Sequence, residues 1–122
     1  MKKGNYGRYI FAVLVGGFFL RVLLYKTGTF FIDVNSFIVW SNTLAQGGLK
    51  NFYISVWSDY LPGYLYVLWF LGKIKDLANL DQLFLFKLPA ILSDLATGYL
   101  IYLIVKKIRD QKAGLIASAV YI

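Results

Sequence analysis

Two long apolar runs constrain what this chain can fold into more than any other feature. Residues 9–25 contain a single charged side chain, Arg21, and residues 83–105 form a second apolar run. An α-helix rises about 1.5 Å per residue and a membrane span needs about 17–25 residues, so each run is long enough to cross a bilayer. A third apolar run, residues 113–122, reads as the start of a further span. The pattern predicts an all-α, multi-pass protein of the cell membrane.

The composition agrees with this prediction and excludes several classes of function. Hydrophobic residues make up 59% of the chain and charged residues only 16%, which is too little to solvate the surface of a small soluble domain. The six acidic residues are all Asp, and the chain has no Glu, His or Cys. Disulfides, thiolate nucleophiles, imidazole bases and Cys/His metal sites are therefore excluded. Any acid–base chemistry has to come from Asp.

The charges predict how the chain is oriented in the membrane. The segments before the first run and after the second run together carry seven basic residues and one acid. The stretch between the runs, 26–82, carries four Lys and four Asp and is neutral. Basic segments stay on the cytoplasmic side, so the N-terminus is expected there and 26–82 outside. The basic clusters then set topology, and nucleic acid is not expected as a partner.

The outer stretch 26–82 is expected to contain helices that lie in the membrane interface. The apolar run 61–75 is short for a span, and its length is typical of an interfacial or re-entrant helix. The alternative is that this run crosses the membrane. We expect one interfacial helix over about 35–47 and a second over about 62–75.

Local signals support the ends of these two helices. The sequence predicts that Gly47-Gly48 ends the first helix and that Pro62 lies in the first turn of the second. A shorter element is expected at 51–57. The side chains expected to cap the first helix are Asp33, Asn35 and Ser36.

Asp33 and Asp59 are the candidate catalytic residues. Asp33 follows the first span closely and would lie near lipid headgroups, where a carboxylate can accept a proton or hold a divalent cation against a phosphate. Helix capping is the alternative role for Asp33. For Asp59 the alternative is a turn residue ahead of Pro62-Gly63.

Five further residues have open roles. Asp94 lies inside the second apolar run, where an ionisable side chain needs a partner, and Lys87 and Arg21 are the candidates for a structural ion pair. Arg21 is alternatively a ligand for a lipid phosphate. Tyr60 and Tyr64 are either interface aromatics or platforms for a substrate.

The order of these features resembles the N-terminal module of the GT-C superfamily of integral-membrane glycosyltransferases. The stretch from Phe31 through Asp33 to Gly47 looks like the segment that carries the catalytic Asp in that superfamily. The run Asp59-Tyr60-Leu61-Pro62-Gly63-Tyr64 is similar to its "Tyr … Asp-Tyr-Pro-Pro" segment, although Leu61 stands where the family often has Pro. The run 87–95, which contains Asp94, looks like the family's next span.

The resemblance implies an inverting sugar transfer at the outer membrane face. A polyprenyl-phosphate-linked sugar would be the donor, and a glycan, lipid or protein the acceptor. Asp33 would act as general base or orient the acceptor, and Asp59 would assist. Some family members use a divalent metal, Mg or Mn, and others do not. The resemblance also implies that these residues are the N-terminal part of one longer membrane domain. The competing expectation is a non-enzymatic polytopic subunit or lipid-binding adaptor.

Overall fold

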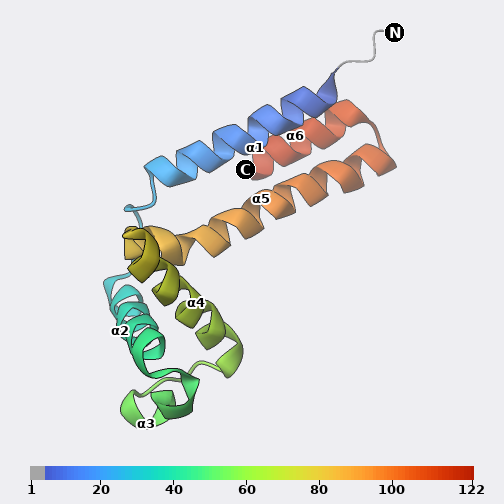
Figure 1. The fold of residues 1–122 in the computed structure, drawn as a ribbon. Helices are drawn as coiled ribbons and strands as arrows, with labels where there is room; N and C mark the ends of the chain where they lie inside the picture. Colours follow the sequence, from blue (N-terminus) through green and yellow to red (C-terminus); the bar gives the residue numbers. More distant parts are fainter. Residues whose placement is uncertain (1–4) are drawn as a thin grey trace. The chain divides into compact units, whose positions relative to one another are not determined.

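The chain folds into helices alone over the part that the structure describes. A computed structural model describes residues 5–122 and contains no β-strand in that range (Figure 1). Lys2 and Lys3, part of the predicted cytoplasmic cluster, lie outside the described residues. A 3-10 turn covers Leu49–Asn51, and the α-helices are α1 (Tyr6–Leu23), α2 (Phe31–Gly47), α3 (Phe52–Ser55), α4 (Pro62–Ala78), α5 (Gln82–Ile108) and α6 (Gln111–Tyr121). The prediction of an all-α chain is confirmed.

Two helices have the length and apolar composition needed to cross a membrane. They are α1 and α5. Helix α5 contains the whole predicted run 83–105, whereas α1 ends at Leu23, two residues before the end of the predicted run 9–25. The remaining helices of residues 5–122 do not meet the same criteria; α4 has 17 residues and α6 has 11. Pro89 lies inside α5 without ending it.

The start of α2 corrects one prediction. The helix begins at Phe31, about four residues before the expected start, and among residues 5–122 no side chain caps it. Asp33 therefore lies in the first turn, where its charge is favourable near the positive end of the helix dipole. The hydroxyl of Ser36 donates to the carbonyl oxygen of Ile32 at 3.1 Å, inside the helix. The last residue with a left-handed backbone before the helix is Gly28, whose φ is +60°.

Other helix ends lie where the sequence places them. Gly48 has a φ of +68°, a value that favours glycine, and its N–H donates to the carbonyl oxygen of Leu44 at 2.9 Å, which ends α2. Pro62 is the first residue of α4. The short element expected at 51–57 is the 3-10 turn followed by α3. Helix α4 runs on to Ala78 and ends at Asn79, which has a left-handed backbone.

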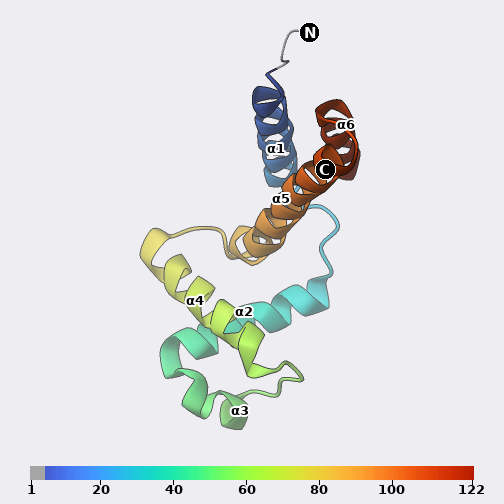
Figure 2. The ribbon, with the colours of Figure 1, turned by 90° about the vertical axis from the view of Figure 1, so that its right-hand side faces the viewer.

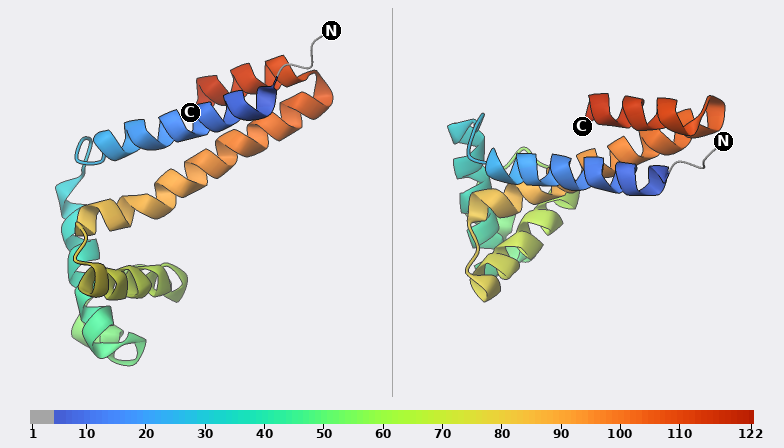
Figure 3. Two further views of the ribbon diagram at one scale, coloured as in Figure 1. Left: turned by 45° about the horizontal axis from the view of Figure 1, so that its top comes forward. Right: turned by 90° about the horizontal axis from the view of Figure 1, so that it is seen from above.

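The helices form two compact units, which are described separately. The first unit contains α1, the part of α5 from Pro89 onwards, and α6. Within it α1 and α5 run antiparallel, so that the start of α1 lies near the turn from α5 to α6 (Figures 1 and 3). Helix α6 packs against α1. At Gly114 the helices come so close that a Cβ would lie 2.7 Å from the carbonyl oxygen of Tyr102.

The second unit contains residues 25–88 and is built around α2 and α4. These two helices pack together, with the 3-10 turn and α3 at one end of α2 (Figure 2). They come close together at Gly72, where a Cβ would lie 2.8 Å from the carbonyl oxygen of Ser41. The amide of Gln82 donates to the hydroxyl oxygen of Ser41 at 3.2 Å. The buried core of this unit is Trp40, Leu44, Phe52, Leu65, Leu68, Leu71, Leu85 and Phe86.

Candidate functional site

The two candidate carboxylates line the same cavity in the second unit. Asp33 comes from the first turn of α2, and Asp59 comes from the segment between α3 and α4. The cavity has a volume of about 260 Å³. Its lining contains both carboxylates, one hydroxyl and five apolar or aromatic side chains: Ile32, Asp33, Ser36, Phe37, Trp40, Trp57, Asp59 and Tyr60.

Helix α2 supplies one wall of the cavity because of the spacing of its residues. Asp33, Ser36, Phe37 and Trp40 stand at positions i, i+3, i+4 and i+7, which share one face of a helix. The polar members come first, and Trp40 is buried with 6% of its surface exposed. This face therefore passes from a carboxylate at the helix start to an aromatic wall one to two turns later.

Asp59 is positioned by hydrogen bonds on both sides of it. The indole N–H of Trp40 donates to the carbonyl oxygen of Trp57 at 3.2 Å, and the hydroxyl of Tyr53 donates to the carbonyl oxygen of Tyr60 at 3.0 Å. Ser58 makes the local turn contact, since its hydroxyl oxygen accepts the backbone N–H of Tyr60 at 3.2 Å. The chain on either side of Asp59 is thus fixed to α2 and α3, and its carboxylate is not needed for the turn.

Tyr60 is held by aromatic contacts and completes the cavity. Its ring centroid lies 5.7 Å from that of Phe37, 5.3 Å from that of Trp40 and 5.6 Å from that of Tyr64. Tyr64 supports this arrangement from α4 without lining the cavity, and its ring also contacts Phe37 at 5.5 Å. Burial, and then the neighbouring Tyr60, raise the pKa of Tyr64 above its usual value of 10, so it remains a neutral phenol at physiological pH.

The carboxylates have no partner within residues 5–122. Neither Asp33 nor Asp59 forms a hydrogen bond or an ion pair with another described residue, and both are exposed. The described residues contain no group of three or more acidic side chains that could hold a metal ion. Mg²⁺ is usually bound by one or two carboxylates together with waters and substrate phosphates, so this pair fits that type of ion.

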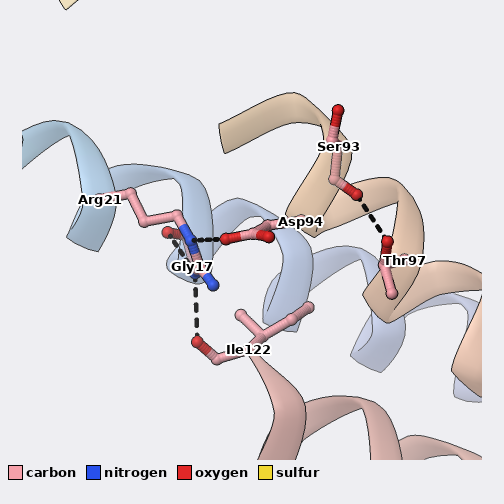
Figure 4. A network of polar contacts seen from close by, with 6 residues as sticks. All are labelled: Gly17, Arg21, Ser93, Asp94, Thr97 and Ile122. Atoms are coloured by element: carbon pink, nitrogen blue, oxygen red, sulfur yellow. Dashed lines mark hydrogen bonds and ion pairs between the residues drawn. The ribbon is translucent and has the colours of Figure 1, made fainter. Parts of the chain in front are cut away.

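Arg21 and Asp94 belong to the first unit and form an ion pair there (Figure 4). The Nε of Arg21 lies 3.5 Å from a carboxylate oxygen of Asp94, and its Nη1 donates to the carbonyl oxygens of Gly17 at 3.3 Å and Ile122 at 3.1 Å. Of the two expected partners for Asp94, the structure therefore has Arg21. The structural role of Arg21 is supported by these contacts.

Lys87 has a different role from the expected one. It belongs to the second unit, and its ammonium group donates to the carbonyl oxygen of Thr27 at 3.0 Å and to the hydroxyl oxygen of Thr29 at 3.2 Å. It thereby ties the segment before α2 to the start of α5.

The sequence reasoning missed the two tryptophans of the cavity. No expectation from the sequence placed Trp40 or Trp57 at the candidate site. The spacing between Asp33 and Trp40 could have placed these two side chains on one face of the helix, since seven residues make about two helical turns. No local signal places Trp57 beside them.

Comparisons with protein-family models, with curated proteins and with solved structures found no match to this chain. The arrangement of residues in the cavity is accordingly the basis for assigning a function.

Proposed function

We propose that this chain carries the outer-face catalytic site of a membrane glycosyltransferase of the GT-C type. Such an enzyme transfers a sugar from a polyprenyl-phosphate lipid to a glycan, lipid or protein acceptor. The observation that carries the proposal is the joint placement of Asp33, Asp59 and Tyr60 around one cavity. The same residues belong to the two segments that resemble the superfamily's catalytic loop.

The composition of the cavity suits a sugar and a reacting hydroxyl. Trp57 and Tyr60 offer aromatic faces together with polar edges, which suits the mixed apolar and polar surface of a sugar ring. The volume of about 260 Å³ lies just below the range of about 300–1,000 Å³ found for drug-sized ligands, and so favours a small group.

In the proposed reaction Asp33 is the general base. The acceptor hydroxyl oxygen bonds to the anomeric carbon of the donor sugar while the bond from that carbon to the lipid phosphate oxygen breaks. The hydroxyl proton goes to the Asp33 carboxylate, and the phosphate leaves with the electron pair. Asp59 lies in the same lining and orients the acceptor.

If a divalent cation such as Mg²⁺ or Mn²⁺ takes part, Asp33 and Asp59 are the residues that would hold it. When bound, the cation would neutralise the negative charge of the leaving phosphate. The fit rests on carboxylate chemistry alone, because oxygen ligands are those that these ions prefer.

The surroundings of the cavity support a place at the membrane interface. Large apolar side chains are exposed near it: Phe31, Ile54, Trp57 and Leu61 each have at least 73% of their surface exposed. Exposed apolar residues in such numbers are typical of a surface that contacts lipid or another protein. The antiparallel course of α1 and α5 also supports the proposed topology, since the segment between two antiparallel spans leaves and re-enters the membrane at one face.

The substitution Asp33→Asn tests the proposal in membranes that contain the full-length protein. Asn keeps the shape of Asp but cannot accept the proton, and losing a general base typically costs about 10²–10⁴ in rate. Because Asp33 does not cap α2, the protein level should stay the same. The assay measures sugar transfer from a polyprenyl-phosphate donor to a mixture of membrane acceptors.

Asp76→Asn is the matched control. Asp76 is also an exposed Asp of the second unit, but it lies beside Lys75 at 3.7 Å and does not line the cavity. It should retain wild-type transfer, and Asp59→Asn should lose less activity than Asp33→Asn. Undiminished transfer by Asp33→Asn would contradict the proposal and favour a non-enzymatic membrane subunit or lipid-binding adaptor.

A further inference from the structure

A second cavity lies in the first unit, whereas the carboxylates described above belong to the second unit. It has a volume of about 440 Å³ and lies between the first half of α1, the end of α5 and the turn to α6. Its lining residues are polar at the helix ends, where Asn5, Lys106 and Gln111 stand. Further along the helices the lining is apolar, with Ile10, Phe11 and Leu14 on α1.

This gradient matches an amphiphile that lies along the helices. From Asn5 to Leu14 the helix advances by about 13 Å at 1.5 Å per residue, which spans the change from a polar to an apolar lining. A molecule with a polar head at the helix ends and a hydrocarbon chain along α1 would meet groups of matching polarity at both levels. Membrane lipids have this form.

The charge around the cavity selects an anionic head. Among the described residues that line it, Lys106 is the one charged side chain, and its ammonium group lies 5.5 Å from the centre of the Tyr102 ring. Asp110, the nearest acid in the sequence, does not line this cavity. Its carboxylate is engaged by the backbone N–H of Ala113 at 2.8 Å. The basic residues at the same helix ends are Arg8, Lys106, Lys107, Arg109 and Lys112.

We propose that this cavity binds the headgroup of an anionic glycerophospholipid, with Lys106 as the residue that contacts the phosphate. Basic pockets between membrane helices on the cytoplasmic side are known to hold acidic headgroups. The basic flank of the two spans is the side that topology rules assign to the cytoplasm. The bound lipid belongs to the inner leaflet and fills the space between α1 and the end of α5. This site is independent of the proposed transferase activity.

The test measures lipid that remains bound to the purified full-length protein. The protein is extracted from vesicles of phosphatidylcholine with a minor share of phosphatidylglycerol, and each retained lipid is quantified by mass spectrometry. Wild type should retain phosphatidylglycerol in preference to phosphatidylcholine. Lys106→Gln should lower that preference about tenfold or more, because a hydrogen bond to a charged group is lost. Lys107→Gln removes the same charge from the next residue, which does not line the cavity, and should lower it less than about fivefold.

A second pair of variants tests the cavity without changing any charge. Gly7 lines the cavity, and among the described residues no atom lies within 4 Å of where its Cβ would be. The side chain of Gly7→Leu would enter that open space and should lower phosphatidylglycerol retention as strongly as Lys106→Gln. Gly16→Leu is the control, since Gly16 has equally open surroundings but lies outside the cavity.

Three results would overturn the proposal. Equal losses in Lys106→Gln and Lys107→Gln would indicate diffuse attraction to the membrane surface. Equal retention of phosphatidylglycerol and phosphatidylcholine by wild type would indicate an apolar groove with no choice of headgroup. Unchanged retention in Gly7→Leu would show that the cavity itself is not the binding place, as expected if another part of the protein fills it.

Discussion

The contacts inside the first unit differ in kind from the contacts inside the second. In the first unit the helices approach at glycines, and Gly17, Gly98 and Gly114 all lie against neighbouring helices or their side chains. Small residues that allow close backbone approach are a common basis for packing between membrane helices. The second unit is held mainly by aromatic rings, with Phe37 contacting four other rings.

The difference indicates what each unit can do. In the first unit the charged side chains inside the two predicted runs, Arg21 and Asp94, are used in an ion pair. Rings that meet at angles fix a loop and leave space between them, which is how the second unit presents two unpaired carboxylates. The candidate chemistry therefore belongs to the unit that is held by aromatic contacts.

The largest contrast between the units should appear in their exposure to the two sides of the membrane. Single cysteines at Ser55 or Ser58, in the second unit, should react with an impermeant thiol reagent added to intact cells. A cysteine at Gln111, in the first unit, should react only after permeabilisation, because it lies within the basic cluster. Reaction of position 111 in intact cells would break the proposed topology.

The next largest effect is expected for the aromatic core. Phe52 is fully buried, and Phe52→Ala should lower the free energy of unfolding by about 3–5 kcal/mol, the usual cost of removing a buried Phe ring. The thermal loss of helicity, followed by circular dichroism in detergent, measures it. Ile54→Ala in the same helix is the control, since Ile54 is 86% exposed and its truncation should leave the unfolding midpoint nearly unchanged.

A smaller effect is expected where the backbones of the first unit meet. The Cβ of Gly114→Leu would lie 2.7 Å from the carbonyl oxygen of Tyr102 and 3.0 Å from the backbone nitrogen of Lys106. Overpacking of this kind costs about 1–3 kcal/mol, seen as a lower unfolding midpoint. Gly16→Leu, in open surroundings, supplies the comparison. Equal midpoints for the two variants would show that close approach does not hold this unit together.

The smallest effect is expected for Trp40→Phe, which keeps a ring in the core but removes the donor to Trp57. A single hydrogen bond contributes about 0.5–1.5 kcal/mol, so the fold should persist while residues 56–61 become more mobile. Hydrogen–deuterium exchange of that segment should accelerate, with exchange in α4 unchanged. Unaltered protection of 56–61 would mean that ring contacts alone position Asp59.

The helices of this chain could be predicted because their signals are local. Apolar runs of span length predicted α1 and α5, and Gly47-Gly48 and Pro62 marked two helix ends. The start of α2 was misplaced because Asp33, Asn35 and Ser36 are all good capping residues, yet the helix begins ahead of them. Likewise α6 begins at Gln111, earlier than the apolar run, because Asp110 caps it with a 2.8 Å hydrogen bond to Ala113.

The candidate site was predictable only in part, for a physical reason. Asp33 and Asp59 could each be named from their position in the sequence and from the resemblance. Their meeting at one cavity depends on contacts between distant residues, such as the indole of Trp40 with the carbonyl oxygen of Trp57. Helical spacing predicts which residues of one helix share a face. It does not predict where a distant loop will pack against that face.

The distribution of indole rings gives the protein an optical property of its own. All three tryptophans, Trp40, Trp57 and Trp69, lie in the second unit, so its intrinsic tryptophan fluorescence reports on that unit alone. Trp40 is 6% exposed and Trp57 is 80% exposed, and both line the same cavity. Trp40 therefore fluoresces from a buried environment and Trp57 from a solvent-exposed one. A sugar that enters there should shift the emission and shield Trp57 from a soluble quencher. A lipid bound between α1 and α5 should leave the tryptophan emission unchanged.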